Sequence, residues 1–358
     1  MAGDLKALLR PRSVALVGAS ANPSKLGNVA LVNLAGGDYE LYPINPKEET
    51  ILGLRCYGSV SAIPHEVDLA VVSLPAEAAA SAVRDCVDKG VNVVIVNASG
   101  FKETGAEGEA RERELAGLVK GSRTRLLGPN TMGVLVPSSG LDTIFIPKDR
   151  SPRPGPGDVA MVSQSGAVSV AFMEKAAASN VGLSACVGIG NKADIDETDL
   201  LELLGRDDQT KCIAMYLESF SDGRRFFNTA NDVSRSKPIV LLKSGRSTSG
   251  SAAAMSHTGA IASSSDGLVD GALRQAGVVR VYDEEELLDV SKALSRIGHI
   301  RGRRVCIVAS AGGYGVVTAD LVESTQNGAG MRVATLSDST KDALREVVPQ
   351  FASVGNPV

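Results

Sequence analysis

Two residues in the second half of the sequence could carry phosphoryl-transfer chemistry, His257 and Glu218. His257 lies in Ser244–Ala260, a stretch of mostly small residues without apolar periodicity that follows the apolar run Pro238–Lys243. A histidine in such a loop is presented at the carboxyl end of a sheet strand, where the sites of α/β proteins lie. Neutral imidazole attacks phosphoryl groups near neutral pH, so His257 is a candidate nucleophile.

A histidine nucleophile needs an orienting partner on its second ring nitrogen, and Glu218 is the candidate for that role. Glu218 ends the run Lys211–Leu217, a predicted strand next to the one that precedes the histidine loop. A structural histidine and a surface carboxylate at a strand end are the alternatives for the two residues. His65 and His299 lack comparable neighbours and are given no role.

A phosphorylated histidine carries additional negative charge and requires fixed hydrogen-bond donors. Hydroxyls and free amides at a helix N-terminus suit an anion. The turn between a predicted strand at 158–162 and a predicted helix over 167–178 offers such donors from Ser163, Gln164, Ser165 and Gly166. An ordinary helix cap uses the same donors, so the two interpretations are compatible.

The N-terminal part of the chain contains a second candidate site, a glycine turn that follows the predicted strand Ser13–Val17. Gly18, Ala19 and Ser20 lead from that strand into a predicted helix. Backbone amides in such a turn can face a phosphate, and the helix dipole favours it. The match to GxGxxG is poor because the next glycine is Gly27, and a plain tight turn is the alternative.

Two lysines near this turn narrow the class of ligand. Ser24 and Lys25 add a hydroxyl and a positive charge to the loop, and a second predicted strand ends in Asn45, Pro46 and Lys47. NAD-binding folds usually place an acidic residue at the end of that strand. A lysine there suits a ligand with an extra phosphate on its adenosine ribose, which describes both CoA and NADP. A solvated lysine on a turn is the alternative.

The elements that position these residues are predicted to be those of an α/β protein. Short β-branched runs alternate with longer Ala- and Leu-rich stretches along the whole chain, which favours parallel sheets covered by helices. We predict a first domain over 1–136, a Pro- and Gly-rich linker over 137–157, and a second domain over 158–300. Residues 301–358 begin a third domain with too few strands and helices to bury both faces of a parallel sheet, so it is predicted to be incomplete.

The composition excludes several other classes of protein. The chain has 358 residues and a formal net charge of -4, which argues against a nucleic-acid partner. No apolar run approaches the roughly 20 residues of a membrane span, and we identify no signal peptide. The five cysteines form no CxxC pair and are interpreted as buried, reduced thiols of a cytoplasmic protein. With three histidines, a histidine-rich metal site is not expected.

Taken together, the motifs resemble those of a known family, the NDP-forming (ADP-forming) acyl-CoA synthetases and the related succinyl-CoA ligase α subunits. In the first domain the resemblance rests on Gly18–Gly27, Asn45–Lys47, Pro75, Asn97–Phe101 and Gly128–Asn130. In the rest of the chain it rests on Ser163–Gly166, Gly190–Asp194, Tyr216–Glu218, Ser256–Ala260 and Ala311–Gly313. These motifs occur in the order found in the family and span nearly the whole chain.

The resemblance implies a Rossmann-like CoA-binding domain followed by flavodoxin-like parallel α/β domains, the last one incomplete. It implies that Glu218 orients His257. It also implies CoA contacts from Gly18, Ala19, Ser20, Ser24, Lys25, Asn45, Lys47, Pro75, Asn97, Ala98, Ser99 and Asn130.

The implied reaction converts an acyl-CoA, phosphate and ADP into a carboxylic acid, CoA and ATP, through an acyl phosphate and a phosphohistidine on His257. The sequence has no GxxxxGK[ST] and no carboxylate cluster suited to magnesium. By resemblance, ATP or ADP and Mg²⁺ therefore bind to an ATP-grasp β subunit or a missing C-terminal half. A hetero-oligomer, or a dimer of fused chains, is expected to act on a small carboxylic acid.

Two departures from the family pattern bear on the substrate. Thr131 stands where succinyl-CoA ligases often have cysteine, and Tyr314 stands where the acyl-CoA synthetases commonly have proline. Both weaken an assignment to succinyl-CoA. A succinyl-CoA ligase α subunit, a regulatory CoA-binding module without phosphoryl transfer and an NADP-dependent oxidoreductase remain as alternatives. The oxidoreductase would explain Lys47 but not the second domain.

Overall fold

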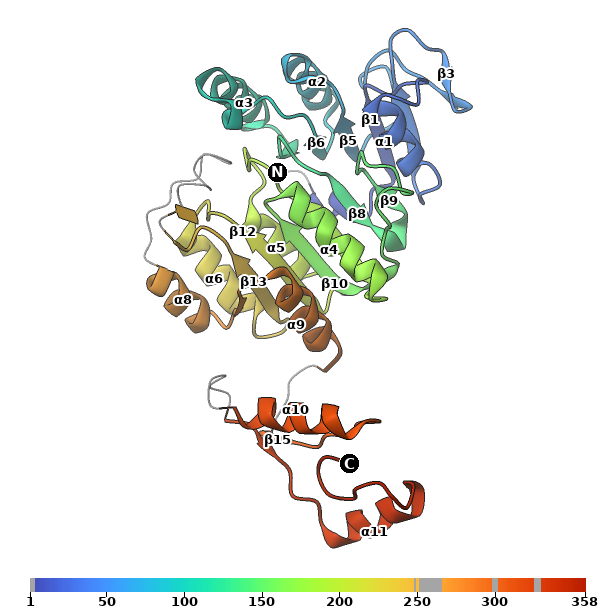
Figure 1. The fold of residues 1–358 in the computed structure, drawn as a ribbon. Helices are drawn as coiled ribbons and strands as arrows, with labels where there is room; N and C mark the ends of the chain where they lie inside the picture. Colours follow the sequence, from blue (N-terminus) through green and yellow to red (C-terminus); the bar gives the residue numbers. More distant parts are fainter. Residues whose placement is uncertain (1–3, 248, 251–265, 298–301, 325–329) are drawn as a thin grey trace. The chain divides into compact units, whose positions relative to one another are not determined.

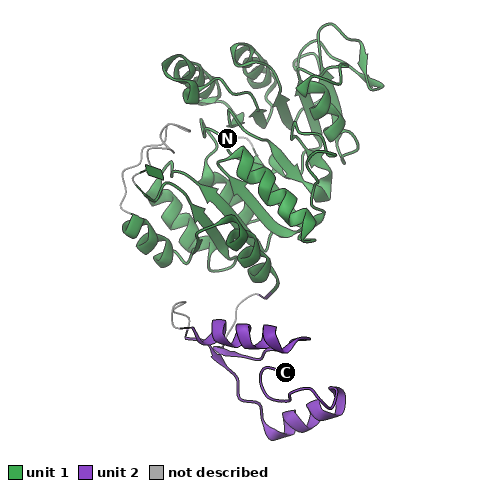
Figure 2. Ribbon diagram, in the orientation of Figure 1, with its two compact units in different colours: residues 1–296 green, residues 297–358 purple. Residues whose placement is uncertain are grey.

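The computed structural model of the chain describes residues 4–247, 249–250, 266–297, 302–324 and 330–358 (Figure 1). It divides into two compact units, Met1–Arg296 and Ile297–Val358 (Figure 2). The first unit contains two large sheets and a two-stranded hairpin, and every candidate site residue of the sequence lies within its limits. The position of His257 and that of Ser256 are outside the described residues.

The first sheet is parallel throughout, with the strand order β2-β1-β5-β6-β7. Its strands are β1 (Ser13–Val17), β2 (Glu40–Ile44), β5 (Leu69–Val72), β6 (Val93–Val96) and β7 (Arg125–Leu127). Every residue of β1, β5 and β6 is buried, as expected for central strands with both faces covered. The strand order reverses direction between β1 and β5, and α/β sheets bind ligands outside the carboxyl ends of the strands at such a point.

Helices cover this sheet on both faces. They are η1 (Leu5–Leu8), α1 (Leu26–Leu34), α2 (Ala76–Lys89), η2 (Lys102–Thr104) and α3 (Ala106–Val119), and the short hairpin β3 (Thr50–Ile51) with β4 (Leu54–Arg55) lies after β2. On α2 the buried residues Ala76, Ala79, Val83 and Cys86 recur at helical spacing and face the sheet. The helix ends where Gly90 adopts a left-handed conformation, with φ +77°.

The second sheet has the strand order β14-β13-β12-β10-β11-β8-β9. Its parallel part consists of β10 (Pro156–Ser163), β11 (Leu183–Gly188), β12 (Cys212–Leu217), β13 (Ile239–Lys243) and β14 (Val279–Val281). Four of these five strands lie close to the bounds that their apolar runs predict, 158–162, 183–189, 212–217 and 238–242, whereas β14 was not predicted.

The region between the two domains differs from the predicted simple linker. The strands β8 (Val134–Val136) and β9 (Leu141–Asp142), joined by η3 (Pro137–Ser139), pair antiparallel with one another, and β8 pairs antiparallel with β11. The segment before β10 therefore completes the second sheet and covers the backbone edge that β11 would otherwise expose. The sequence did not predict these antiparallel strands, because the apolar run 134–136 carries no local signal of strand direction.

Two layers of helices cover the second sheet. On one face, Phe172 and Met173 of α4 (Gly166–Ala178) pack with Leu287 and Leu288 of α9 (Glu284–Ile297). The helices on the opposite face are α5 (Glu197–Gly205), α6 (Gly223–Val233) and α8 (Asp266–Gln275). These two layers leave the carboxyl ends of the strands accessible, where the candidate catalytic residues were predicted.

The second unit is small, with a two-stranded parallel sheet of β15 (Arg304–Val305) and β16 (Arg332–Val333) and the helices α10 (Gly312–Glu323) and α11 (Asp338–Val347). Large apolar side chains are exposed on it, among them Val308 at 79% and Phe351 at 93%. The interpretation of this unit as part of a second flavodoxin-like domain stays a prediction.

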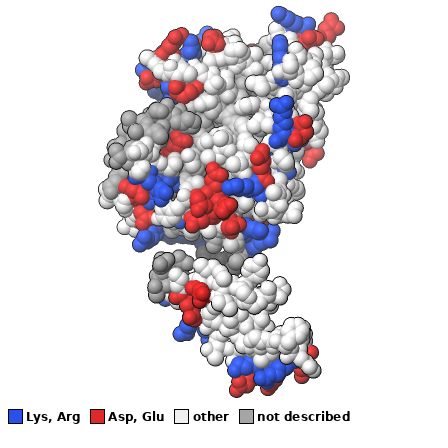
Figure 3. All heavy atoms as spheres, in the orientation of Figure 1, with Lys and Arg blue, Asp and Glu red and all other residues white. Residues whose placement is uncertain are grey.

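The molecular surface carries both signs of charge. On the face shown in Figure 3, Lys and Arg side chains are interspersed with Asp and Glu side chains. In the part of the chain that the structure describes, no helix is both long and apolar enough to cross a membrane.

Candidate functional site

A pocket of about 860 Å³ lies at the carboxyl ends of β1, β2 and β5, where the strand order of the first sheet reverses. We call it the β1–β5 pocket. Among the residues predicted to bind CoA, those that line it are Gly18, Ala19, Ser20, Lys25, Asn45, Lys47 and Pro75. Residues of α2, including Ser81 and Asp85, form the opposite wall. The structure thus brings together predicted CoA contacts that are up to 57 residues apart in the sequence, the distance between Gly18 and Pro75.

The glycine turn at the base of this pocket is held against its neighbours with no room for a side chain. Gly18 has φ +91°, and a Cβ atom on it would approach the carbonyl oxygen of Ser73 to 2.7 Å. The side chain of Asn45 donates to the carbonyl oxygen of Ala19 at 2.9 Å, so the end of β2 fixes the turn. The positive φ and the close packing against Ser73 therefore require glycine at this position, as the tight turn of a dinucleotide-binding fold does.

The two predicted lysines are available for an anionic ligand. Lys25 and Lys47 are exposed, and neither forms an ion pair within the residues that the structure describes. The backbone amide of Lys47 is fixed by the side chain of Asn45 at 2.9 Å. Ser24 lies outside the pocket lining and donates its hydroxyl to Asn22 at 2.7 Å. The structure therefore favours the lysines over Ser24 as contacts for phosphate.

The other residues predicted to contact CoA follow β6 and β7. They are Asn97, Ala98, Ser99 and Asn130, and none of them lines the β1–β5 pocket. The backbone amide of Asn130 donates to the carbonyl oxygen of Ala98 at 2.8 Å, and its side chain donates to Asn191, in the turn after β11, at 3.3 Å. These residues form a loop that runs from the first sheet towards the second.

Two buried polar atoms at this edge of the first sheet have no partner among the described residues, Ser73 Oγ and Asn97 Oδ1. They lie just after β5 and β6, and an unsatisfied buried polar atom costs about 1–3 kcal/mol. A bound ligand with its own amide groups would satisfy them. Together with the glycine turn and the two lysines, these atoms fit CoA, whose pantetheine carries amides and whose nucleotide carries phosphates.

The second candidate site lies at the carboxyl ends of β10 and β12. Glu218 follows β12 and is 8% exposed. Its backbone amide donates to the side-chain oxygen of Gln164 at 2.9 Å, and its carbonyl oxygen accepts from Lys243 at 2.7 Å. Tyr216 directs its hydroxyl at the Glu218 carboxylate, at 3.5 Å. The structure therefore places the backbone of Glu218 in contact with the 163–166 turn.

The serine hydroxyls of the 163–166 turn form hydrogen bonds with the turn itself and with the start of α4. Ser163 donates its hydroxyl to the carbonyl oxygen of Ser165 at 2.7 Å, and Ser165 accepts from the amide of Val168 as the cap of α4. Gly166 is the first residue of α4, one residue earlier than predicted. The helix-cap interpretation is thus correct for Ser165, and the free amides at the start of α4 still present a positive dipole end.

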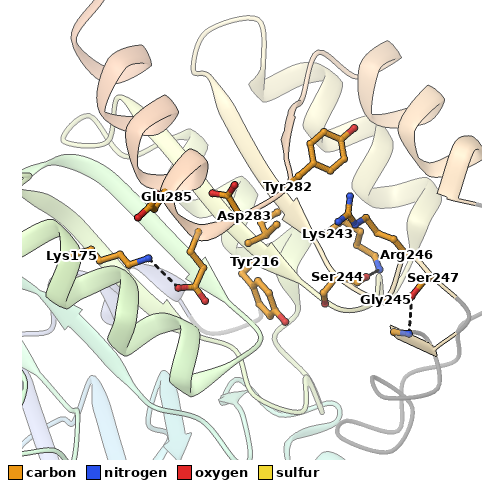
Figure 4. A pocket seen from close by; sticks show the side chains of 13 residues that line it. Lys175, Tyr216, Lys243, Ser244, Gly245, Arg246, Ser247, Tyr282, Asp283 and Glu285 are labelled. Carbon is orange, nitrogen blue, oxygen red and sulfur yellow. Dashed lines mark hydrogen bonds and ion pairs between the residues drawn. The ribbon is translucent and has the colours of Figure 1, made fainter. Parts of the chain in front are cut away.

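A pocket of about 820 Å³ lies beside Glu218, at the ends of β13 and β14. Figure 4 shows Lys175 and Glu285 on one side of it and Lys243 and Arg246 on the other, with Tyr216 between them. Burial lowers the pKa of Lys243, and the charge of Arg280 lowers it further. Since β12 and β13 pair with Leu217 opposite Lys243, the chain leaves β13 beside Glu218, 14 residues before position 257.

Sequence reasoning gave no role to Asn191, which contacts Asn130 of the first domain, or to Lys192, which contacts Ser219 beside Glu218. The side chain of Lys192 is 5% exposed, forms an ion pair with Glu197 at 3.0 Å and donates to the carbonyl oxygen of Ser219 at 2.9 Å. Burial lowers its pKa, although the charge of Glu197 opposes the shift. The only signal was the Gly190–Asp194 motif itself, since a charged residue in a turn is usually solvated.

The part of the chain that the structure describes contains no group of three or more His, Cys, Asp or Glu side chains that could hold a metal ion. Three of the five cysteines, Cys86, Cys186 and Cys212, are buried, whereas Cys306 is exposed, contrary to the prediction of buried thiols. All five are free thiols in the structure.

The fold and the two sites define a class of protein, a CoA-binding Rossmann-like domain joined to a ligase domain of the flavodoxin type. Comparison with known families agrees. A model of the CoA binding domain matches residues 12–137, and a model of the succinyl-CoA ligase like flavodoxin domain matches residues 156–294. The predicted fold class is confirmed.

Individual relatives narrow the class. The chain is 41% identical to the α subunit of ADP-forming acetate–CoA ligase I of Pyrococcus furiosus, over 99% of this chain and 76% of the relative. It is 35% identical to the ADP-forming 4-hydroxybutyrate–CoA ligase of Nitrosopumilus maritimus, over 98% of this chain and 50% of the relative. The structure of acetyl-CoA synthetase 1 of Candidatus Korarchaeum cryptofilum with phosphate and ADP superimposes with a TM-score of 0.89 at 39% identity, over 99% of this chain and 75% of that one.

The chain therefore belongs to the family of the ADP-forming acetate–CoA ligase α subunits. The predicted resemblance, enzyme class and use of CoA and a nucleotide are confirmed at the level of the family. The relatives extend beyond the matched part, by about a quarter for the α subunit and about half for the 4-hydroxybutyrate enzyme. That extra length agrees with the expectation of a partner or a further C-terminal half.

Proposed function

We propose that this chain is the CoA-binding and phosphohistidine-carrying part of an ADP-forming acyl-CoA ligase that acts on a short carboxylic acid such as acetate. The observation that carries the proposal is the contact between the 163–166 turn and Glu218, beside the strand that leads towards position 257. This arrangement supplies a carboxylate, a lysine and a helix N-terminus at one edge of a sheet, which is the set that a phosphohistidine requires.

The first step takes place on CoA bound in the β1–β5 pocket. The glycine turn and Lys25 face the pyrophosphate, Lys47 faces the phosphate on the ribose, and the pantetheine extends along Asn97–Ser99 and Asn130 towards the second sheet. An oxygen of inorganic phosphate attacks the thioester carbon of the acyl-CoA, the carbon–sulfur bond breaks, and CoA leaves as a thiolate that takes up a proton. The product is an acyl phosphate.

The second step transfers the phosphoryl group to the protein. A ring nitrogen of His257 attacks phosphorus, the bond from phosphorus to the acyl oxygen breaks, and the carboxylate leaves. Glu218 accepts a hydrogen bond from the other ring nitrogen and stabilises the positive charge that develops on the ring. The 163–166 turn and the amides of α4 bind the phosphoryl oxygens.

The third step needs a second protein part. ADP attacks the phosphohistidine, the phosphorus–nitrogen bond breaks and ATP forms. We propose that an ATP-grasp β subunit or C-terminal half supplies the ADP and Mg²⁺ sites, so the assembly is a hetero-oligomer or a dimer of fused chains. The additional length of the relatives supports this proposal. We further propose a cytoplasmic location, since free thiols are typical of reducing compartments.

The experiment that tests this function is phosphorylation of the purified chain by γ-labelled ATP together with its ATP-grasp partner. An acid-labile, alkali-stable label in the wild type that is absent from His257→Ala is the expected result. Glu218→Gln should retain the fold and bind CoA but label slowly. A wild-type chain that binds CoA and takes no label would contradict the proposal and indicate a regulatory CoA-binding module instead.

A further inference from the structure

The turn that connects β11 to α5, residues 189–196, lies between the two sheets of the first unit and contacts both candidate sites. Its central residue Asn191 is 2% exposed. The Asn191 side chain donates to the carboxylates of Glu103 and Glu112, each at 2.7 Å. The ammonium group of Lys102 donates to the carbonyl oxygen of Asn191. The turn is therefore fastened to the first domain by charged hydrogen bonds.

The second carboxylate oxygen of Glu103 contacts the 97–101 loop, which includes the residues proposed to bind the pantetheine. Glu103 Oε1 accepts from the backbone amides of Gly100 at 2.6 Å and of Phe101 at 3.0 Å. Burial raises the pKa of Glu103, but the hydrogen bonds from Asn191 and from these amides outweigh burial and hold it below its ordinary value. The carboxylate thus stays ionised and joins the 97–101 loop to Asn191.

Lys192, the next residue of the turn, makes the contacts with the second candidate site. Lys192 has φ +61°, a conformation that costs a lysine free energy and persists where surrounding contacts enforce it. Its ammonium group donates to Ser219 O at 2.9 Å and to Ser219 Oγ at 3.2 Å. Ser219 in turn donates its backbone amide to Gln164 Oε1 at 3.2 Å, the same oxygen that accepts from Glu218.

We propose that Asn191 and Lys192 are positioning residues that hold the 97–101 loop at a fixed distance from Glu218. The connection runs from the loop through Glu103, Asn191, Lys192 and Ser219 to Gln164 and the amide of Glu218. This inference rests on the proposed function, because it matters only if an acyl group on CoA must meet a phosphoryl acceptor beside Glu218. Reacting groups held on two separate sheets need such a bridge, since a displacement of about 1 Å can lower a rate about 100-fold.

A second set of contacts between the domains helps to distinguish the positioning role of Asn191 from a role in holding the domains together. Arg125 forms ion pairs with Asp194 at 2.9 Å and with Asp199 at 2.8 Å, and these contacts reach neither the 97–101 loop nor Ser219. They keep the sheets together when Asn191 is changed. Loss of Asn191 is therefore expected to alter the alignment of the sites more than the association of the domains.

The test compares Asn191→Leu with Asn33→Leu. Asn33 is also 2% exposed and also donates its amide to buried carbonyl oxygens, at 2.7 Å and 2.9 Å, but it lies on α1 away from the bridge. Both variants lose a buried amide, so both are expected to lose stability. In the enzyme assembled with its ATP-grasp partner, kcat should fall about tenfold or more for Asn191→Leu while the KM for CoA changes less than about twofold. Asn33→Leu should retain the wild-type kcat.

Hydrogen exchange provides a readout that does not require turnover. In the wild-type chain, added CoA should slow exchange of the Glu218 and Ser219 amides at least about threefold, because ordering the 97–101 loop stabilises the bridge. Asn191→Leu should bind CoA with the affinity of the wild type and lose this slowing. CoA binding without slowing in the wild type, or equal slowing in both chains, overturns the bridge and leaves the proposed function standing. A wild-type chain that neither binds CoA nor supports acyl-CoA formation overturns both.

Discussion

The side-chain oxygen of Gln164 accepts a 2.9 Å hydrogen bond from the backbone amide of Glu218. Gln164 follows β10 and Glu218 follows the adjacent strand β12, so the contact links the two turns at one edge of the second sheet. Gln164 is 6% exposed, and its amide group also donates to Ser219 at 3.2 Å. The buried Gln164 side chain therefore fixes the backbone at Glu218, the residue whose carboxylate we propose to orient His257.

Replacement of Gln164 by leucine is expected to separate CoA binding from phosphoryl transfer. The amides of Glu218 and Ser219 lose their acceptor, which costs about 1–3 kcal/mol, and the rate of phosphorylation should fall about tenfold. CoA affinity should be unchanged, because the β1–β5 pocket lies on the other sheet. Urea unfolding, labelling rates and calorimetry measure the three quantities. Gln209→Leu, at an exposed glutamine, is the control, and equal labelling rates for the two variants would argue against the role.

Gly18→Ala and Gly36→Ala form a matched pair for the glycine turn. Both glycines have φ +91°, but a Cβ on Gly18 would meet Ser73 O at 2.7 Å whereas a Cβ on Gly36 meets nothing within 4 Å. Both alanines cost roughly 1–2 kcal/mol of backbone strain. Only Gly18→Ala should also displace the turn and weaken CoA binding, by tenfold or more as an order-of-magnitude estimate. Calorimetry with CoA distinguishes them, and retained affinity in Gly18→Ala would exclude this turn from the CoA site.

Lys47→Ala should discriminate between two forms of the ligand. If Lys47 contacts the phosphate on the ribose, its removal weakens CoA binding about tenfold, equivalent to about 1.4 kcal/mol, and leaves the binding of dephospho-CoA unchanged. Titration of both ligands into both chains measures the difference. An equal loss of affinity for the two ligands would mean that Lys47 contacts another part of the molecule.

Asp199 should make the first unit sensitive to acid. Burial raises the pKa of Asp199, but hydrogen bonds and charge from Arg225 and Arg125 outweigh it and lower the pKa below its ordinary value. A carboxyl group with a lowered pKa in the folded state contributes stability above its unfolded pKa and loses it as the pH falls through the folded value. Asp199→Asn should therefore be less stable than the wild type by about 2 kcal/mol at pH 7, less than for a fully buried pair because Arg225 is 38% exposed.

The difference in unfolding free energy between Asp199→Asn and the wild type should shrink as the pH falls below about 4. Urea unfolding at several pH values measures it. Asp208→Asn, at an exposed carboxylate two residues beyond Arg206, is the control and should stay close to the wild type. A difference that is the same at pH 3 and pH 7 would show that packing of the side chain, not its charge, is responsible.

Local patterns predicted the central strands well. The strand β1 was predicted at its observed bounds and β12 within one residue, because both are short apolar runs that end at a glycine or a polar residue. The antiparallel strands β8 and β9 were not predicted. Their residues read as the end of one domain and a linker, and the direction in which a strand pairs depends on the edge that is available to it.

The candidate site residues likewise include some that local sequence patterns predicted and others that they did not. Gly18, Lys47, Gln164 and Glu218 were identified from their types and from their places after predicted strands, and the structure puts each at the carboxyl edge of its sheet. The importance of Asn191 was not recognised, because its partners Glu103 and Glu112 lie 88 and 79 residues earlier in the chain. No local spacing relates such residues.

By itself the sequence determined the α/β class, the order of the domains and the residue types offered for phosphate chemistry, because apolar periodicity and turn residues are properties of neighbouring positions. Only the tertiary structure decided which of those residues meet. The packing of the two sheets brings Asn191 against Glu103, and the pairing order within the second sheet brings Lys192 against Ser219. Such contacts depend on how separate segments fold together, and the linear spacing of residues does not contain that information.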